Sequence, residues 1–342
     1  MRKRVTSKDV AEKVGVSRTT VSLVLNDVKG IQISPETRQK VLDTAAELKY
    51  VPNAAAQALA SSRTKAIGLV LTRTQHHIAT DAFLPSIISG LLTTAKKQNI
   101  RILVDWVEID HQESAYFELA HTRRIDGMIL STPRLNDTGL KALENLEIPT
   151  VLLGSIVESN LHYVDVDNVS AAEKAVAYLI SLGHKDIACI TNAPPEYTSA
   201  PERIKGYKNA LLKQEIPINE ALIRYADFDP DSGYECMKSI LQSGEKFSAV
   251  FVASDNVAIG AKSALRDARL HIPDDISIVG FDDIPWAKYS DPPLTTVQLP
   301  AESIAQSACT LLLNLINDGD RDKQHQIILD TELIIRKSCK PL

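Results

Sequence analysis

Several features that would place the chain in a common class are absent from its sequence. No apolar run among the 342 residues approaches the roughly 20 residues that a membrane-spanning helix needs. The charged N-terminus MRKRVTSKDV has no apolar stretch behind it, so the pattern of a secretory signal peptide is missing. We therefore expect a cytoplasmic protein with no membrane partner.

Cysteine is scarce, and the four cysteines are scattered, with no CxxC pair and no neighbouring histidine at ligand spacing. This predicts reduced thiols rather than a disulfide framework or a zinc site. The adjacent His76 and His77 have no third ligand in the pattern, so we interpret them as part of a solvated loop. We expect no metal and no cofactor.

Motifs of catalytic and nucleotide sites are also missing. No GxGxxG or GxxxxGK[ST] follows an apolar run, and there is no GxSxG. An α/β enzyme needs a catalytic constellation of this kind, so we do not expect an enzyme.

Charge is unevenly divided along the chain. Residues 1–65 contain 12 Lys and Arg against 6 Asp and Glu, whereas the remaining residues contain 26 against 37. A basic head on an acidic body favours a polyanionic partner for the head.

The basic head predicts three helices. The stretch Thr6 to Asp9 has a capping-box pattern, which starts a helix that ends near Val14. After a turn at Gly15, Ser17 is a natural N-cap for a second helix over residues 18–25. Ser34 and Pro35 begin a third helix, which we expect to run to Tyr50.

Two short helices joined by a glycine turn, the second rich in Arg, Ser and Thr, are typical of a helix-turn-helix. In such a module Arg18 would bind guanine and Thr19 would contact a second base. The short donors Ser17, Thr20 and Ser22 suit phosphate oxygens. A helical hairpin in any small domain has the same pattern and stays an alternative at this point.

From Ala66 onward, apolar runs alternate with amphipathic helical segments. Such a pattern indicates parallel sheets covered on both faces, and the number of strands favours two doubly wound lobes. Ligands of open α/β sheets bind at the carboxyl ends of strands. Those ends are expected at Leu71-Thr72, Ser131-Thr132, Gly154-Ser155, Thr191-Asn192, Phe228, Ser254-Asp255 and Phe281-Asp282-Asp283.

Particular stretches of the sequence are more specific for a protein family than the general pattern of helices and strands. KDVAEKVGVSRTTVSLVLN and SPETRQKVLDTAAELKYVPNAAAQALAS resemble the headpiece of the LacI/GalR family of bacterial repressors. The resemblance continues through RIDGMIL, VDVDN, YLISLGHKDIACI, PERIKGYKNAL, ASDNVAIGA, ISIVGFDDI and DPPLTTV. It implies an all-α helix-turn-helix headpiece plus an α/β periplasmic-binding-protein-like body of two doubly wound parallel-sheet lobes.

The resemblance also implies roles for residues of the headpiece. It assigns base reading to Arg18 and Thr19, and contacts with the DNA backbone to Ser17, Thr20, Ser22 and Asn26; we add Thr6 to the DNA-binding set. Leu23 stands where the family usually has Arg, so the base preference at that position is expected to differ. Residues 53–61 correspond to the family's hinge helix, in which Leu59 would enter a minor-groove base step and Ala56 would allow close approach.

In the body, the resemblance implies a ligand between the lobes. Arg203 and Asp282 match the family's two charged anchors, and a guanidinium with a carboxylate suits vicinal hydroxyls. The other expected effector-binding residues are Phe83, Ser131, Ser199, Phe228, Ser254 and Trp286. Trp286 could equally pack on the surface, the two phenylalanines could belong to the core, and Arg203 could be a structural ion-pair partner.

We therefore expect a headpiece at 1–52, a hinge and linker at 53–64, and an effector-binding and dimerisation domain at 65–342. Its N-lobe would span about 65–166 and 298–328, and its C-lobe about 167–297 and 329–342. The expected function is a homodimeric repressor that binds a pseudo-palindromic operator in double-stranded DNA under the control of a small effector, most simply a sugar. A purine- or protein-corepressed regulator and a sugar-binding protein without a DNA role are the alternatives.

Overall fold

The computed structural model describes residues 5–26, 30, 32–51, 58, 63–146, 148–156, 159–318 and 324–342. It consists of two compact units, Met1–Lys65 and Ala66–Leu342. In the part of the chain that it describes, no helix is long and apolar enough to cross a membrane.

The first unit, the headpiece, has the expected helix-turn-helix. Its first two helices are α1 (Ser7–Val14) and α2 (Arg18–Leu25). The backbone N–H of Thr6 donates to the Asp9 carboxylate at 2.7 Å, as in a capping box. Gly15 ends α1 at φ 78°, a conformation in which glycine has no steric penalty. The Ser17 hydroxyl then caps α2 by accepting from the Thr20 N–H at 3.0 Å.

The third helix, α3 (Pro35–Glu47), begins where the sequence predicts and ends three residues earlier than expected. Ser34 caps it through the Thr37 N–H at 3.2 Å. The helix stops because Lys49 takes a left-handed φ of 51°. Its closing bond joins the Tyr50 N–H to the Ala45 carbonyl at 2.8 Å, so Tyr50 lies beyond the helix.

One small core holds the three helices of the headpiece together. It is built from Val10, Ala11, Val21, Val24, Val41 and Ala45. Because α2 turns Val21 and Val24 inward, Arg18 and Thr19 near its N-terminus stay exposed.

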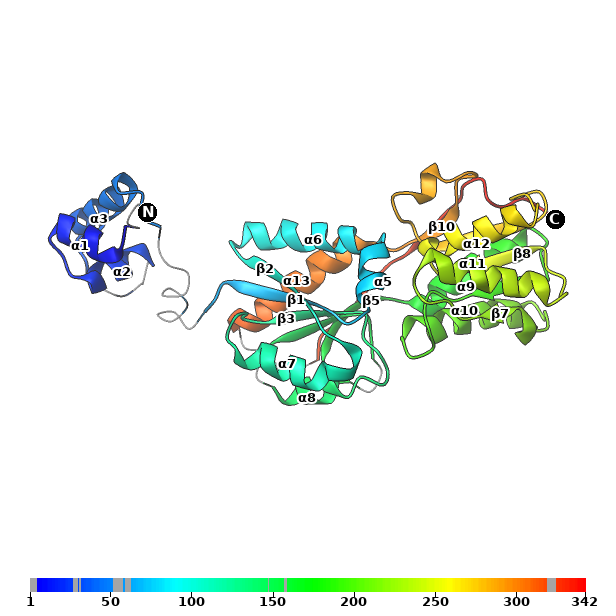
Figure 1. Cartoon of the computed structure of the whole chain (residues 1–342), viewed down its shortest axis with the longest axis horizontal. Helices are drawn as coiled ribbons and strands as arrows, with labels where there is room; N and C mark the ends of the chain where they lie inside the picture. The colour runs from blue at the N-terminus through cyan, green and yellow to red at the C-terminus, as the bar shows by residue number, and fades with distance from the viewer. Residues whose placement is uncertain are drawn as a thin grey trace. The chain divides into compact units, whose positions relative to one another are not determined.

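The second unit contains two lobes, each built on one six-stranded sheet (Figure 1). The N-lobe sheet has the order β11-β5-β4-β3-β1-β2, and every printed pairing in it is parallel. Its strands are β1 (Ala66–Leu71), β2 (Arg101–Trp106), β3 (Met128–Ser131), β4 (Thr150–Leu153), β5 (His162–Val166) and β11 (Gln326–Leu329).

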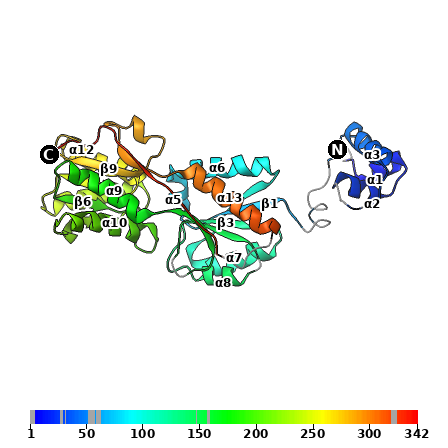
Figure 2. The same ribbon diagram turned by 180° about the vertical axis from the view of Figure 1, so that it is seen from behind.

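Helices cover both faces of the N-lobe sheet, as Figures 1 and 2 show from opposite sides. One face packs against α6 (Leu84–Lys97) and α13 (Ala301–Asp318), and the other against α7 (Gln112–His121) and α8 (Gly139–Asn145). Successive residues of β1 face opposite ways, Leu69 toward α6 and α13 and Val70 toward α7. The short helix α5 (Gln75–Thr80) and the turn η1 (Ile109–His111) complete the lobe.

The C-lobe repeats this plan with the order β12-β10-β9-β8-β6-β7. Its edge strand β12 pairs antiparallel with β10, while the other printed pairings are parallel. The strands are β6 (Ile187–Ile190), β7 (Ile223–Arg224), β8 (Ala249–Val252), β9 (Ser277–Asp282), β10 (Thr295–Gln298) and β12 (Glu332–Ile334).

Two pairs of helices enclose the C-lobe sheet. One face packs against α9 (Asn168–Ser181) and α10 (Ser199–Lys213), the other against α11 (Pro230–Gln242) and α12 (Asp255–Asp267). A Cβ at Gly206 would lie 2.2 Å from the Val169 carbonyl oxygen, so glycine is what lets α10 approach α9. The turns η2 (Glu220–Leu222) and η3 (Ala287–Tyr289) lie in this lobe.

Two local expectations are wrong. The strand expected to end at Phe228 forms only at Ile223–Arg224, because the chain then leaves the sheet edge and Phe228 reaches a left-handed φ of 65°. His76 and His77 lie on helix α5 rather than in a solvated loop, and His77 is only 8% exposed.

Candidate functional site

A cavity of about 1070 Å³, counted with its open mouth, lies between the two lobes. Both lobes line it, and seven of the eight expected effector residues are in its wall: Phe83, Ser131, Ser199, Arg203, Phe228, Ser254 and Asp282.

The cavity lies where topology predicts a site in each lobe. In the N-lobe the strand order reverses between β1 and β3, and in the C-lobe it reverses between β6 and β8. Ligands of doubly wound sheets bind at the carboxyl ends of such strands. Ser131 ends β3, while Asn192 and Ser254 follow β6 and β8, and all three line the cavity.

The two expected charged anchors lie together on the C-lobe wall. The Arg203 guanidinium is 3.6 Å from the Asp282 carboxylate, donates to the Ala253 carbonyl at 2.6 Å, and donates to Asn168 Oδ1 at 3.0 Å. Its carbon centre lies 3.8 Å from the centre of the Phe281 ring. Arg203 is only 6% exposed, so its neighbours hold it in one position.

Asp282 combines a raised pKa with a strained backbone. Burial raises its pKa to about 6, while Arg203 and the Ser254 hydroxyl, 3.0 Å away, oppose that rise. Its φ is 116°, and Thr132 and Phe228, which also line the cavity, have φ of 56° and 65°. Strained non-glycine residues of this kind cluster at functional sites.

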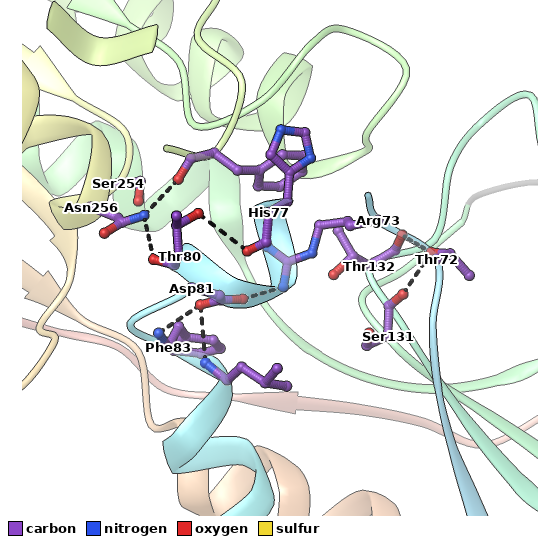
Figure 3. Close-up of polar contacts among 12 residues, drawn as sticks. Thr72, Arg73, His77, Thr80, Asp81, Phe83, Ser131, Thr132, Ser254 and Asn256 are labelled. Carbon is purple, nitrogen blue, oxygen red and sulfur yellow. Dashed lines mark hydrogen bonds and ion pairs between the residues drawn. The ribbon is translucent and has the colours of Figure 1, made fainter. Parts of the chain in front are cut away.

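A second ion pair stands on the N-lobe wall. Arg73 pairs with Asp81, and Asp81 also accepts from the Phe83 N–H at 2.6 Å and the Leu84 N–H at 3.0 Å (Figure 3). Asp81 therefore fixes the start of α6 and the guanidinium together. The same guanidinium lies 4.9 Å from the centre of the Phe228 ring of the C-lobe.

Helix α5 touches the C-lobe beside the cavity. His76 Nε2 lies 2.9 Å from the Asp229 carboxylate, and His77 Nε2 lies 3.4 Å from that of Asp227. Asn256 Nδ2 donates to the Thr80 carbonyl at 3.2 Å and to the Phe228 carbonyl at 2.8 Å (Figure 3). These contacts exist only while the lobes stay in this arrangement, so a change in lobe spacing would break them.

Two acidic side chains meet where the chain passes from β5 to α9. Asn168 Nδ2 donates to Glu202 at 3.1 Å and to Asp165 at 3.4 Å, while its oxygen holds Arg203. Burial and the Asp165 charge raise the pKa of Glu202 to about 7. Burial also raises the pKa of Asp165. Asn168 thus connects the crossing segment to the Arg203 anchor.

The headpiece presents a different kind of site. Three of its lysines are paired with glutamates, namely Lys8 with Glu12, Lys13 with Glu47 and Lys40 with Glu36. Arg18, exposed at the start of α2, makes no ion pair with any described residue. Its charge is therefore available to a partner.

The remaining expected DNA-binding residues are distributed around α2. Thr6 and Asp9 are bound to each other at the start of α1. Ser17 and Thr20 hydroxyls lie 2.9 Å apart, and Asn26 donates to Ser22 at 3.2 Å. Thr19 is exposed and Leu23 half-buried. Ala56 and Leu59 lie outside the described residues.

Comparison with known proteins identifies both units. Residues 6–53 match the model of bacterial regulatory proteins of the lacI family, and residues 176–339 match a periplasmic binding protein-like domain. The transcriptional regulator CelR of Thermobifida fusca is 32% identical over 343 residues, which cover 98% of this chain and 99% of CelR. The chain belongs to the lacI family of bacterial regulatory proteins.

Other lacI-family proteins are similar over the same length. The repressor PurR of Histophilus somni (strain 129Pt) is 32% identical, with 98% of this chain and 99% of PurR covered. A CelR–cellobiose complex has a TM-score of 0.76 at 30% identity and covers 98% of this chain and all of that one. The lac repressor dimer bound to operator and the anti-inducer ONPF has a TM-score of 0.86 at 29% identity over 99% of this chain and all of that one. These relatives are named as regulators.

One expected effector residue, Trp286, lies outside the wall of the cavity. Trp286 is 64% exposed and does not line the cavity. After β9 the chain turns so that Ile284, 3% exposed, faces inward and Trp286 faces solvent. We therefore remove Trp286 from the candidate site.

The expected effector-binding set lacks several residues of the cavity wall: Arg73, Asp81, Asp165, Asn168, Tyr197, Thr198 and Asn256, while Thr132 and Asn192 were expected only as strand ends. The strand-end rule points to some of them, since Arg73 lies two residues beyond β1 and Asn192 two beyond β6. Tyr197 and Asp81 carry no such signal, because loops and a short helix bring them to the wall.

Proposed function

We propose that the chain is a sequence-specific transcriptional regulator, a repressor, whose affinity for operator DNA is controlled by a small ligand bound between the lobes. Two features support this proposal: the unpaired, exposed Arg18 at the start of α2, and the interlobe cavity with its Arg203–Asp282 pair. We also propose a cytoplasmic location and no catalytic activity, in keeping with relatives that are named as regulators.

On the DNA side, Arg18 and Thr19 read base edges in the major groove, and Ser17, Thr20, Ser22 and Asn26 contact phosphates. Thr6 extends the phosphate contacts to the start of α1. Leu23 cannot donate to guanine, so it changes the preferred base. For Ala56 and Leu59 the proposal of a minor-groove hinge rests on the family resemblance alone.

The proposed assembly is a symmetric dimer. The lac repressor structure is a dimer on its operator. We propose the same for this chain: a homodimer whose headpieces bind inverted half-sites about one helical turn apart.

For the ligand, a sugar is the first choice. CelR has been solved with cellobiose, and a guanidinium–carboxylate pair can both donate to and accept from sugar hydroxyls. A purine is the second candidate, because the PurR repressors are similar over the full chain.

Regulation follows from linkage between the two sites. A ligand that prefers one arrangement of the lobes favours one spacing of the headpieces, and so changes operator affinity by its difference in binding energy, typically ~1–3 kcal/mol. The interlobe contacts of α5 are the ones such a change would break or tighten.

The proposal is tested by selecting binding sites from random DNA with the full chain and with Arg18→Ala. The chain should enrich an inverted repeat, and Arg18→Ala should weaken binding by roughly 1–3 kcal/mol and relax one base position per half-site. Lys40→Ala, a cation already paired with Glu36, is the matched control. No enrichment, or an equal effect of both variants, would contradict the proposal.

A further inference from the structure

We propose that the N-lobe carries a second DNA-contacting surface, which binds phosphates of the duplex beside the operator. This surface, here called the basic edge, consists of four exposed cations near the amino ends of the N-lobe strands: Lys96, Lys97, Arg123 and Arg124. The inference rests on the proposed function and adds to it a DNA contact outside the headpiece.

The basic edge lies around the point where the chain enters the second unit. Ala66, the first residue of β1, is paired with the first residue of β2, and α6 ends at Lys97 shortly before that strand. On the other side of β1, the Ala66 carbonyl accepts from the Asp126 N–H at 2.7 Å, two residues after Arg124. The cavity lies at the opposite, carboxyl ends of these parallel strands. The four cations therefore share one end of the N-lobe, away from the ligand site.

The cations of the basic edge are available to a partner. All four residues are exposed, and none of their side chains forms an ion pair or a hydrogen bond with any residue that the structure describes. Of the acids nearby, Asp126 is half-buried. Glu144, which precedes β4, accepts from the Ser159 hydroxyl and the Asn160 N–H. A group of like charges that lacks such partners attracts a polyanion.

The fold itself does not require these charges. Cations in the last turn of a helix interact favourably with its C-terminal dipole, which could explain them. In the C-lobe, however, α10 has the place of α6, and its last-turn Lys213 is paired with Glu173. Helix α11 has the place of α7 and no basic residue in its last turn. Before β8, which corresponds to β3, Lys246 stands next to Glu245. The unbalanced positive charge is thus a feature of the N-lobe edge.

The connection of the chain indicates which polyanion the basic edge meets. The unit with the helix-turn-helix is joined to the second unit through residues 48–65, which span at most about 60 Å when fully extended. These residues lead into the first residue of β1, at the basic edge. DNA held by the headpiece is therefore tethered to this edge at a high effective concentration. Its flanks present one phosphate charge per about 1.7 Å of duplex, so they offer partners for all four cations.

The test compares full-length variants on three DNA duplexes. The first ends at the borders of the operator that the chain selects, and the second extends that operator by about one helical turn on each side. The third has the length of the second and a scrambled sequence. Fluorescence anisotropy at several salt concentrations gives the affinity for each duplex and its dependence on salt.

Three variants separate the charge of the basic edge from other effects. The edge variant removes three of its charges: Lys96→Gln, Lys97→Gln and Arg124→Gln. The charge-keeping variant replaces the same residues by the other basic type: Lys96→Arg, Lys97→Arg and Arg124→Lys. The control variant changes the net charge of the chain equally at exposed C-lobe lysines that make no ion pair within the described residues: Lys185→Gln, Lys205→Gln and Lys246→Gln.

At low salt the edge variant should bind the extended operator and the scrambled duplex roughly 10-fold more weakly than the wild type. The slope of log affinity against log salt should fall by up to about 3 per chain, since each neutralised phosphate contributes about 0.9. On the short duplex the edge variant should match the wild type, and its preferred bases should stay the same, because phosphate contacts carry no sequence information. The charge-keeping and control variants should match the wild type on all three duplexes.

Wild-type affinity and salt slope of the edge variant on the extended duplex would overturn the inference. An equal loss in the edge and control variants, an equal loss on the short and extended duplexes, or a loss in the charge-keeping variant would also overturn it. Failure of the proposed function is seen separately, because the chain would then select no operator while the scrambled duplex still measures the basic edge.

Discussion

The two lobes share one strand order and contribute different chemistry to the cavity between them. The N-lobe supplies an apolar floor from Leu84, Ile87, Leu153 and Val164, with the Arg73–Asp81 pair at its edge. The C-lobe supplies a polar wall that contains Asn192, Ser199, Arg203, Ser254 and Asp282. Since the two lobes share one strand order, the difference lies in the side chains that their strands, helices and loops place on the wall, and we propose that the C-lobe has the larger part in hydroxyl recognition.

Removal of Arg203, the cationic anchor of the C-lobe, should have the largest effect on the ligand response. Arg203→Ala leaves Asp282 buried without its cation, which costs about 3–5 kcal/mol in comparable pairs, so the ligand response should be lost. Titration calorimetry and operator binding with and without the sugar that binds the wild type check this.

Arg203→Lys keeps the charge and guards against misfolding of the alanine variant. It should bind the sugar roughly 10–100-fold more weakly, because an ammonium lacks the planar fork of donors. Arg266→Ala, at an exposed arginine of the same lobe, should behave as the wild type. Wild-type affinity in Arg203→Lys and Arg203→Ala would place the ligand elsewhere.

Removal of Arg73, the N-lobe counterpart of Arg203, should weaken sugar binding less. Arg73→Ala removes the pair with Asp81 and the contact with Phe228, and we expect sugar affinity to fall about 10-fold, less than for Arg203. The measurement is the same titration, with the exposed Arg101→Ala as control. A loss of sugar affinity equal to or larger than that of Arg203→Ala would contradict the different roles proposed for the two lobes.

The stability of the C-lobe around Glu202, which accepts from Asn168 at the crossing between the lobes, should depend on pH. Glu202 has a pKa of about 7 in the folded chain against an ordinary value of 4.5, so the folded state binds the extra proton between these values. Its contribution to stability is therefore lost as pH rises through about 7, and fully present below about 4.5. Between pH 5 and 8 the wild type should lose about 1–2 kcal/mol more than Glu202→Gln.

Denaturant unfolding of the second unit at the two pH values measures this difference. The exposed Glu215→Gln should follow the wild type. If Glu202→Gln does so as well, the carboxyl group is not held neutral by its surroundings.

The contacts of α5 across the cavity should give the smallest effect. His76 is 60% exposed at its side chain, so His76→Ala should weaken sugar binding by about 2–5-fold at most, through loss of the Asp229 contact in this lobe arrangement. His111→Ala removes a similar pair with Glu108 that lies within the N-lobe alone, and it should have no effect on the titration. A loss of the same size in both variants would mean that the Asp229 contact plays no part in lobe closure.

Local chemistry explains how much of the fold the sequence predicts. Caps at Thr6, Ser17 and Ser34 start the headpiece helices where expected, because each supplies a side-chain partner for a free backbone group. The apolar runs of β1 and β3 are buried on both faces, so they are recognisable as central strands.

Helices and strands that depend on partners far away in the sequence could not be predicted. Helix α5 has six residues, too few for a clear apolar period, and its histidines contact Asp227 and Asp229, which lie 150 or more residues away in the sequence. The run around Ile223 pairs with β6 for only two residues, because the chain then leaves the sheet edge and Phe228 takes a left-handed φ of 65°.

The residues of the site also separate into those that could be predicted from local sequence and those that could not. Arg203, Asp282, Ser131 and Ser254 could be predicted because they follow strands or match a family motif. Trp286 also follows a strand, but the turn after β9 sends it to the surface. Arg73 and Asp81 could not be predicted as a pair, since only the turn of the chain before α6 brings them together.

We propose above that a ligand in the interlobe cavity controls the affinity of α2 for operator DNA. The most direct measurement is the affinity of the full chain for its selected operator, at fixed salt, with and without the neutral sugar found by thermal shift. We predict that the sugar changes the operator affinity of the wild type by about 5–150-fold and leaves that of Arg203→Lys nearly unchanged, while both bind operator alike in its absence. Equal operator affinity of the wild type with and without the bound sugar would contradict the account.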